Sequence, residues 1–307
     1  MRASAILSEP LAGLQAQALG LATAAGLQPR VVELHPRAPW SWVAARMWPA
    51  PLRAVRLPEL GDSVLFTSGG TAGVVGAALR RPGRPVVQVQ HPRIDPARFD
   101  IVVVNRHDGL TGPNVIVTRT ALHPATPARL AQAALDWAPR LAHLPRPLVA
   151  VLVGGSNGRF RLDLPVAQAL GAQLAGMMRL DHVGLALTPS RRTSPEARAA
   201  LRAAVKPEGG WVWDMQGDNP YFGLLALADV IVATEDSVSM VSEAAATRAP
   251  VLLAPLPGRS RRIRLFNRLL QEDGRVRPFA GRLDGWPVTP IDDTQAAADA
   301  VRHRLGL

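Results

Sequence analysis

Short runs of apolar, often β-branched residues alternate along the chain with longer stretches in which apolar positions recur every three or four residues. The short runs have the composition of strands that are buried on both faces of a parallel sheet. The longer stretches have the spacing of helices that bury one face. This alternation of strands and helices is typical of α/β proteins with parallel sheets.

The pattern predicts a set of strands and helices in each half of the chain. In the first half we expect strands at 3–7, 30–34, 63–67, 86–89, 101–104 and 115–117, and helices at 13–25, 74–80 and 126–141. In the second half we expect strands at 148–153, 183–188, 211–214, 228–233 and 251–254, and helices at 164–178, 222–227, from 237 onward and 292–307.

Prolines at 139, 145 and 147 indicate a linker between the two halves. We therefore expect two Rossmann-like domains that face a cleft, at 1–145 and 146–307. The terminal helix at 292–307 is expected to pack back on the first domain.

The stretch at 227–255, LADVIVATEDSVSMVSEAAATRAPVLLAP, predicts a strand, a tight turn, a helix and a further strand. Asp236 and Ser237 are candidate N-caps of the helix. Its N-terminus then lies beyond the carboxyl end of a parallel strand, where anions bind. Glu243 follows Ser239 by four residues on the same helix face, within reach of a ribose attached to a phosphate at the helix N-terminus. We expect half of a nucleotide site, with Ser237 and Ser239 near the phosphate and Glu243 facing the ligand.

Further loops are predicted to reach the same edge of the second sheet. The strand at 148–153 is followed by a glycine-rich turn, which lets a ligand approach the backbone closely. The candidate residues in these loops are Gly154, Gly155, Ser156, Asn157, Arg159, Arg191, Arg192 and Arg259. The arginines could contact base or phosphate, and they also fit a solvated surface.

In the first half, the loops after 86–89 and 101–104 carry three candidate bases for an acceptor hydroxyl. These candidate catalytic residues are His91, Asp95 and Asp108. Each of them also fits a role in a turn or a cap.

Composition narrows the class of partner. The chain is 48% hydrophobic and 19% charged, which is ordinary for a globular protein. Its 35 basic and 24 acidic residues give a net charge of +11, and Lys206 is the single lysine. Such an arginine bias indicates GC-rich codon usage rather than selection for nucleic acid, while the positive field favours smaller anionic partners such as nucleotides. Without cysteine there is neither a disulfide framework nor a thiolate metal site.

Membrane contact is expected to be peripheral. No apolar run approaches the ~18 residues that span a bilayer, and polar residues and a proline interrupt the apolar start of the chain, so we expect a cytoplasmic protein. Trp40, Trp42 and Trp48 lie among arginines, a combination that suits the inner face of an anionic membrane. The alternative is a short helix whose tryptophans pack on the domain.

Several site classes are disfavoured because their motifs are missing from the sequence. There is no G-x-x-x-x-G-K-[ST], no G-x-G-x-x-G opening the first helix of either half and no H-E-x-x-H. No D-x-D pair is present to hold a metal on a diphosphate. We therefore expect arginines, backbone N–H groups and helix dipoles to neutralise a bound nucleotide diphosphate, with no metal and no cofactor.

Five stretches resemble a known family. They are QVQHPRIDPARFDIVVVNRHDG at 88–109, GGSNGRF at 154–160, TPSRRT at 188–193, GDNPYFGLLALADVIVATEDSVSMVSEA at 217–244 and PGRSRRIRLFNRLL at 257–270. The chain resembles the mitochondrial-fission, or elongated-mitochondria, family of glycosyltransferase-like proteins of bacteria and plants. The resemblance implies a GT-B fold, with a nucleotide-sugar donor on the C-terminal domain and the acceptor on the N-terminal one. The first loop, at 9–15, departs from the family's Asp- and Gly-containing pattern, and no acceptor role is assigned to it.

The resemblance also implies roles for some residues. Glu243 matches the helix carboxylate that holds ribose hydroxyls, Ser237 and Ser239 match phosphate or sugar contacts, and 154–157 matches a diphosphate-binding loop. The implied function is metal-independent sugar transfer to a cell-envelope saccharide, as in lipopolysaccharide, or to a lipid-linked acceptor. A non-catalytic adaptor that recruits a partner in organelle or membrane division, and a nucleotide-sugar epimerase, remain alternatives.

Overall fold

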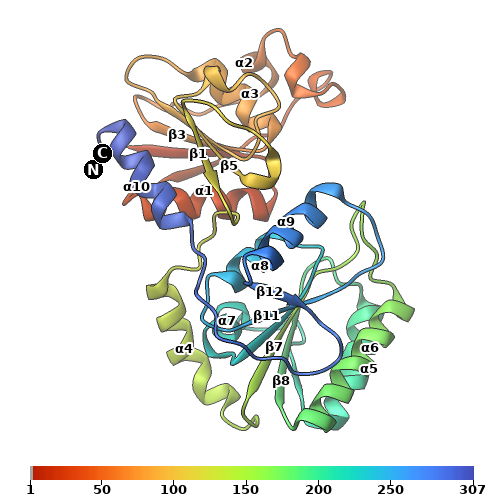
Figure 1. Cartoon of the computed structure of the whole chain (residues 1–307). Coiled ribbons are helices and arrows are strands. Elements are labelled where there is room, and N and C mark those ends of the chain that lie inside the picture. The colour runs from red at the N-terminus through yellow and green to blue at the C-terminus, as the bar shows by residue number, and fades with distance from the viewer. Residues whose placement is uncertain (1–2) are drawn as a thin grey trace. The chain divides into compact units, whose positions relative to one another are not determined.

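The computed structural model describes residues 3–307, which form two compact units (Figure 1). Unit 1 runs to Pro124 and takes in Asp292–Leu307, and unit 2 is Ala125–Ile291. The expected boundary after residue 145 differs from this division by helix α4 (Pro127–Leu141), which lies in unit 2. The last helix, α10 (Thr294–Leu305), is part of unit 1.

Unit 1 contains a six-stranded parallel sheet in the order β2-β1-β3-β4-β5-β6. The strands are β1 Ser4–Ser8, β2 Arg30–Glu33, β3 Val64–Ser68, β4 Val86–Val89, β5 Ile101–Asn105 and β6 Val115–Thr118. The helices before α10 are α1 Ala12–Ala24, η1 Trp40–Trp42, η2 Ala45–Met47, α2 Pro51–Ala54, α3 Gly70–Leu79, η3 Pro96–Arg98 and η4 Arg106–Asp108. The strand order reverses between β1 and β3, which is where α/β sheets open a crevice at their carboxyl edge.

Unit 2 contains a second six-stranded parallel sheet, in the order β12-β11-β10-β7-β8-β9. Its strands are β7 Leu148–Val153, β8 Gly184–Pro189, β9 Trp211–Val212, β10 Val230–Thr234, β11 Val251–Ala254 and β12 Val276–Pro278. After α4 its helices are α5 Leu164–Asp181, α6 Pro195–Val205, η5 Lys206–Glu208, α7 Tyr221–Leu227, α8 Val238–Ala245 and α9 Arg261–Glu272. Here the order reverses between β7 and β10. The prediction of two Rossmann-like α/β domains is confirmed.

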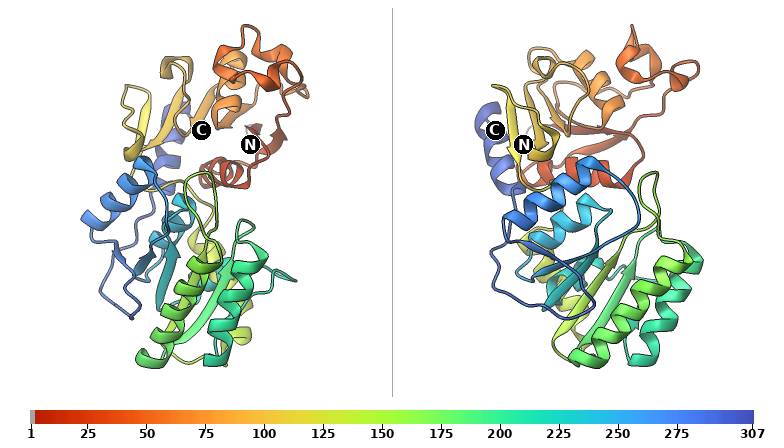
Figure 2. Two further views of the ribbon diagram at one scale, coloured as in Figure 1. Left: turned by 90° about the vertical axis from the view of Figure 1, so that its right-hand side faces the viewer. Right: turned by 45° about the vertical axis from the view of Figure 1, so that its right-hand side comes forward.

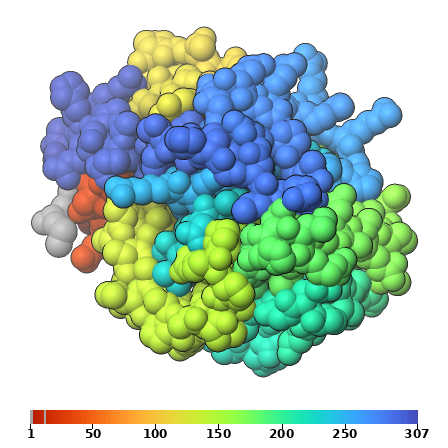
Figure 3. Space-filling view, turned by 60° about the horizontal axis from the view of Figure 1, so that its bottom comes forward, coloured from red at the N-terminus to blue at the C-terminus, as the bar shows by residue number. Residues whose placement is uncertain are grey.

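Helices cover both faces of each sheet (Figure 2). In β7 of unit 2, Val149, Val151 and Val153 pack with α5 and α6, whereas Ala150 and Leu152 pack in a second cluster with α7, α8 and α9. Alternate side chains of a strand point to opposite faces, so one apolar strand serves both clusters. Helices α5 and α6 lie beside each other at the surface of unit 2 (Figure 3).

The sheet of unit 1 is covered by α2 and α3 on one face and by α1 and α10 on the other. Ala297, Ala298 and Val301 of α10 are buried in one cluster with Ala18 and Leu21 of α1. The last helix of the chain therefore completes the core of the unit that the first strand begins.

The tryptophan-rich segment forms short helical turns rather than one helix. Trp48 is 7% exposed, and its Nε1 donates to the carbonyls of Trp40 and Val43, both at 3.1 Å. The rings of Trp40 and Trp48 meet edge to face at 6.4 Å. Trp42, in contrast, is 81% exposed. Packing on the domain thus accounts for Trp48 and much of Trp40, and only Trp42 projects into solvent.

Within residues 3–307, no helix combines the length and the apolar character that crossing a membrane requires.

Candidate functional site

The loops after β7 and β10 meet where the strand order of unit 2 reverses. The N–H of Gly154 donates to Thr234 Oγ1 at 2.8 Å, and the N–H of Gly155 donates to Asp236 Oδ2 at 3.4 Å. Thr234 Oγ1 in turn donates to Asp236 Oδ1 at 2.7 Å. Two loops that are about eighty residues apart in the sequence are therefore joined at the crevice that binds ligands in such folds.

Asp236 is the centre of this junction and holds the guanidinium of Arg192 in place. Its side chain is fully buried and forms an ion pair with Arg192, with Oδ2 and Nη1 2.7 Å apart. Arg192 Nη1 also donates to the carbonyl of Gly155 at 3.2 Å. The Arg192 side chain remains 38% exposed, so a held guanidinium borders solvent beside the loops. Asp236, considered an N-cap in the sequence, instead organises three loops.

The two glycines are explained by close packing. The carbonyl of Gly154 accepts hydrogen bonds from Ser190 Oγ at 2.7 Å and from Thr193 Oγ1. A Cβ on Gly154 would lie 2.2 Å from Asp236 Oδ1, and a Cβ on Gly155 would lie 2.2 Å from the carbonyl oxygen of Arg192. The N–H groups of both glycines are already bonded within the protein. Close packing of the loops therefore explains both glycines, and a diphosphate contact stays a prediction.

The rest of the glycine-rich turn is self-bonded and exposed. Ser156 Oγ accepts the N–H of Leu162 at 2.9 Å, and Asn157 Oδ1 accepts the N–H of Arg159 at 2.9 Å. The N–H of Arg259 donates to the carbonyl of Arg159 at 3.0 Å, which brings these two exposed arginines to neighbouring positions. Arg191 is likewise exposed, next to Arg192.

Helix α8 begins at this junction. Ser237 is its N-cap and accepts the N–H of Met240 at 3.4 Å, so capping explains this serine. Ser239 is partly exposed in the first turn. The first N–H groups of a helix lack partners within the helix and carry partial positive charge, so this end of α8 suits an anion.

The other end of α8 is held by a buried arginine that the sequence analysis did not single out. Arg275 is 2% exposed, and burial lowers its pKa to about 10. Its guanidinium donates at 2.9–3.0 Å to four carbonyls at the C-terminal end of α8 and just beyond, those of Ala244, Ala245, Thr247 and Ala249. A cation at a helix C-terminus is favourable and fixes the position of α8.

Glu243, which is expected to face a ligand, is largely buried in the folded protein. It is 8% exposed, and its Oε2 accepts a short hydrogen bond from the hydroxyl of Tyr221 in α7. Burial raises the pKa of Glu243 to about 7, against the lowering effects of the Tyr221 hydrogen bond and of the Arg129 charge. Burial and the Glu243 charge also raise the pKa of Tyr221. Arg129 itself stacks over the ring of Phe222, 3.9 Å from its centroid. Tyr221 and Arg129 are thus functional candidates missed in the sequence.

The three predicted bases of unit 1 occupy turns. His91 Nδ1 accepts the N–H of Arg93 at 3.1 Å, and Asp95 caps η3 by accepting a backbone N–H at 2.9 Å. Asp108 has a side chain that is 3% exposed and accepts the N–H of Asn105 at 3.3 Å. These local bonds match the turn and capping alternative, and a catalytic role stays a prediction.

The crevice position of unit 1 holds a carboxylate that was given no role. Glu9 follows β1, and its Oε1 accepts the N–H of Thr71 in the first turn of α3 at 3.2 Å. Gln90, which directly follows β4 of the same sheet, donates through Nε2 to Oε1 of Gln17 in α1 at 3.1 Å. The signal for Glu9 is an acid directly after a buried strand, but its importance depends on the strand order, which the sequence does not reveal.

No group of three or more histidine, aspartate or glutamate side chains in residues 3–307 is arranged to hold a metal ion.

Residues 12–305 match the family model described as mitochondrial fission ELM1. The mitochondrial fission protein ELM1 of Arabidopsis thaliana is 31% identical over 275 residues, which cover 80% of this chain and 64% of the plant protein. A UDP-N-acetylglucosamine--N-acetylmuramyl-(pentapeptide) pyrophosphoryl-undecaprenol N-acetylglucosamine transferase of Halorhodospira halophila is 31% identical over 208 residues, which cover 64% of this chain and 52% of that protein. The chain thus spans between about half and two thirds of the length of these relatives.

Among solved structures, the UDP-GlcNAc 2-epimerase of Methanocaldococcus jannaschii is similar with a TM-score of 0.59 at 12% identity, covering 100% of both chains. A second structure of that enzyme, in complex with UDP-GlcNAc and UDP, gives a TM-score of 0.54 at 10% identity, again with 100% of both chains covered. These likenesses show that the fold is of the two-domain type that GT-B glycosyltransferases and these epimerases share. Because the family model covers nearly the whole chain, the protein belongs to the mitochondrial fission ELM1 family.

Proposed function

We propose that this protein transfers a sugar from a UDP-sugar or a related nucleoside diphosphate sugar, bound by unit 2, to a saccharide or lipid-linked acceptor bound by unit 1. One observation carries the proposal: at the strand reversal of unit 2, buried Asp236 fixes Arg192 beside the start of α8. A fixed guanidinium and a helix N-terminus together suit a diphosphate. The names of similar proteins support the choice of donor, since they include a UDP-N-acetylglucosamine-dependent transferase and an epimerase seen with UDP-GlcNAc.

The proposed catalysis is mainly electrostatic. When the bond from the sugar to the diphosphate breaks, negative charge develops on the leaving diphosphate. Arg192, with the exposed Arg159, Arg191 and Arg259 from neighbouring loops, would stabilise that charge without a metal ion. The proton of the acceptor hydroxyl needs a base, for which His91, Asp95 and Asp108 are the proposed candidates.

Glu243 is the proposed partner of the ribose. Tyr221 occupies its Oε2, and among residues 3–307 no hydrogen bond reaches its Oε1. That oxygen would accept a ribose hydroxyl, while Tyr221 and the charge of Arg129 hold the carboxylate in place. Because α8 is fixed at its far end by Arg275, the carboxylate and the helix N-terminus keep a constant separation.

The membrane part of the proposal is peripheral attachment at the cytoplasmic face. Trp42 is 81% exposed and Met47 is 66% exposed, next to the exposed Arg46 and Arg53. Apolar side chains beside arginines suit the interface of an anionic bilayer, where a cell-envelope or lipid-linked acceptor would be presented.

A non-catalytic adaptor is the second candidate. It is favoured by the internal bonds that already occupy Oε2 of Glu243 and the N–H groups of Gly154 and Gly155, and the plant relative is named for mitochondrial fission. In that case the loops of unit 2 would preserve the fold and bind no nucleotide.

Titration calorimetry with UDP and UDP-GlcNAc, in buffer containing EDTA, separates the two candidates. For transfer, the wild-type protein binds in EDTA, and Glu243→Ala weakens binding by roughly ten- to a hundredfold, the effect of losing a hydrogen bond to a charged group. Glu272→Ala is the control, since that glutamate is 61% exposed on α9. A 2′-deoxynucleotide should bind the wild type more weakly, and the Ala variant about equally to the ribose form.

Two results would contradict the transferase proposal. Unchanged nucleotide affinity in folded Glu243→Ala, or no nucleotide binding at all, would favour the adaptor. Affinity that EDTA abolishes and manganese restores would contradict the metal-independent mechanism.

A further inference from the structure

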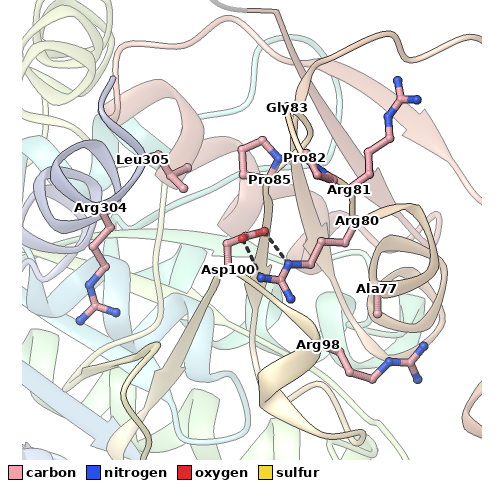
Figure 4. A pocket seen from close by; sticks show the side chains of 10 residues that line it. All are labelled: Ala77, Arg80, Arg81, Pro82, Gly83, Pro85, Arg98, Asp100, Arg304 and Leu305. Atoms are coloured by element: carbon pink, nitrogen blue, oxygen red, sulfur yellow. Dashed lines mark hydrogen bonds and ion pairs between the residues drawn. The ribbon is translucent and has the colours of Figure 1, made fainter.

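A basic pocket lies at the edge of the unit 1 sheet opposite to its crevice (Figure 4). Pro85 and Asp100 line it and directly precede β4 and β5, so it sits at the amino ends of these strands. Strand β5 has five residues, which places the pocket roughly 15 Å from the carboxyl edge at about 3.3 Å per residue. The pocket has a volume of about 690 Å³, and its charged lining consists of Arg80, Arg81, Arg98, Asp100 and Arg304.

The pocket is built around one guanidinium. Arg80 Nε and Nη2 donate to the two carboxylate oxygens of Asp100, both at 3.0 Å, and Nη1 donates to the carbonyl of Ala97 at 3.2 Å. Asp100 also accepts the N–H of Val86 at 2.8 Å, which ties it to the first residue of β4. Three of the five N–H donors of Arg80 are used in this way, so the group is held in place and keeps donors for a ligand.

The remaining charge in the pocket is positive. Asp100 is neutralised by Arg80, which leaves three further arginines. Arg81 pairs at 2.9 Å with Asp62, and both side chains are more than half exposed. Arg304 makes one long contact of 3.4 Å, to the carbonyl of Pro113. The backbone N–H of Arg98 donates to the carbonyl of Asp95 at 3.2 Å, whereas its guanidinium has no hydrogen bond or ion pair within residues 3–307. Figure 4 shows Arg98 and Arg304 on opposite sides of the Arg80–Asp100 pair.

The chemistry of the lining selects a type of anion. A single phosphate would reach only part of a pocket in which Arg98 and Arg304 lie to either side of Arg80. The lining contains no aromatic ring on which a nucleobase could stack. The planar guanidinium of an arginine can bind a phosphate group through two parallel hydrogen bonds. We propose that this basic pocket binds a free, compact polyphosphate, a small molecule with two or more linked or closely spaced phosphate groups.

A bound polyphosphate would also link distant parts of the chain. Arg304 lies in the last turn of α10, whereas Arg80 and Arg98 lie near β4 and β5, about two hundred residues earlier. A ligand that bridges them would hold the end of α10 against unit 1. This site is separate from the proposed donor site, which belongs to unit 2.

Titration calorimetry with sodium tripolyphosphate tests the pocket. We expect binding to the wild type that weakens with added salt, as for exposed charges, and weaker binding of orthophosphate. Arg98→Ala/Arg304→Ala should lower the affinity for tripolyphosphate about tenfold or more. Arg56→Ala/Arg248→Ala removes the same charge from two exposed positions outside the pocket and should keep most of the affinity. Hydrogen–deuterium exchange should show protection at 77–86, 97–101 and the end of α10.

Several outcomes would overturn the proposal. These are no binding by the wild type, equal losses in the two double variants, or protection confined to unit 2. Pocket variants that lower flotation with anionic vesicles but bind tripolyphosphate normally would assign the pocket to a lipid headgroup instead. None of these outcomes depends on nucleotide binding, so the proposed function is tested separately.

Discussion

Glu243 makes the stability of this protein depend on pH. Its pKa is raised from 4.5 to about 7 in the folded state. Between these values the folded protein holds a proton that the unfolded chain has released, so the free energy of unfolding falls as pH rises. The size of this effect is about 3 kcal/mol, at 1.36 kcal/mol per pKa unit.

We therefore predict a pH-dependent difference between the wild type and Glu243→Gln, which cannot titrate at this position. Relative to the variant, the wild type should lose up to about 3 kcal/mol of unfolding free energy between pH 4.5 and pH 8. Urea unfolding of both proteins across this range measures it, and the contributions of other titrating groups cancel in the difference. A constant difference would show that Glu243 has an ordinary pKa.

The glycines of the turn after β7 provide a matched comparison. Gly154→Ala brings a methyl group against Asp236, and we expect it to destabilise the protein by about 2–3 kcal/mol or more, as overpacking does. Gly158 has nothing within 4 Å of a built Cβ, so Gly158→Ala should be neutral within about 0.5 kcal/mol. Chemical denaturation of the two variants checks this. Equal stability would mean that the loops can move apart freely.

The sequence identified some of these residues but not their partners. Glycine after a buried strand and a serine before a helix are local signals, so Gly154 and Ser237 could be recognised. Asp236 looks locally like a second N-cap, and its real contacts with Arg192 and Gly155 come from loops far away in the sequence. The burial of Glu243 depends on Tyr221 in another helix, which no spacing within α8 could reveal.

At the scale of elements, the tryptophan-rich segment divides into a packed and a projecting part. We predict that Trp42→Ala, at an exposed site, changes stability by less than about 0.5 kcal/mol but lowers flotation with anionic liposomes at low salt. Trp48→Ala should instead cost about 3–5 kcal/mol, since a buried ring is lost. Equal flotation of the wild type and Trp42→Ala would remove this segment from the membrane proposal.

Strands were the most predictable elements. Runs such as 148–153 and 101–104 are apolar throughout, which is typical of a strand between two layers of helices, and β7 and β5 lie there. Helix α4 was also expected, but the sequence placed it in the first domain, whereas it belongs to unit 2. An amphipathic helix shows that it buries one face, and only the structure shows that Trp137 of this face packs against Gly223 of α7. Strand β12 is three residues long and contains a polar residue and a proline. It therefore lacks the apolar run that predicts a buried strand, and the sequence did not reveal it.

At the scale of the whole molecule, unit 1 depends on the last helix of the chain. Asp293 pairs at 2.7 Å with Arg119, and Val301 is fully buried against α1. We predict that Val301→Asp, which places a charge in this core, speeds hydrogen exchange in α1, β1 and β3. The sheet of unit 2 should be unaffected. Asp299→Ala, at an exposed position of the same helix, is the control and should leave both units unchanged.

The dependence of unit 1 on α10 reverses the usual order of folding during synthesis. N-terminal domains commonly fold first as they leave the ribosome. Here the segment 125–291 is continuous and can fold once it has emerged, whereas the residues that α10 covers must wait until residues 294–305 have been synthesised. Until then Leu21 and Ala22 of α1 lack that partner, so a nascent chain of this protein offers chaperones an apolar surface at its beginning. A stop codon that removes residues 292–307 would therefore damage unit 1, most of which is translated before unit 2.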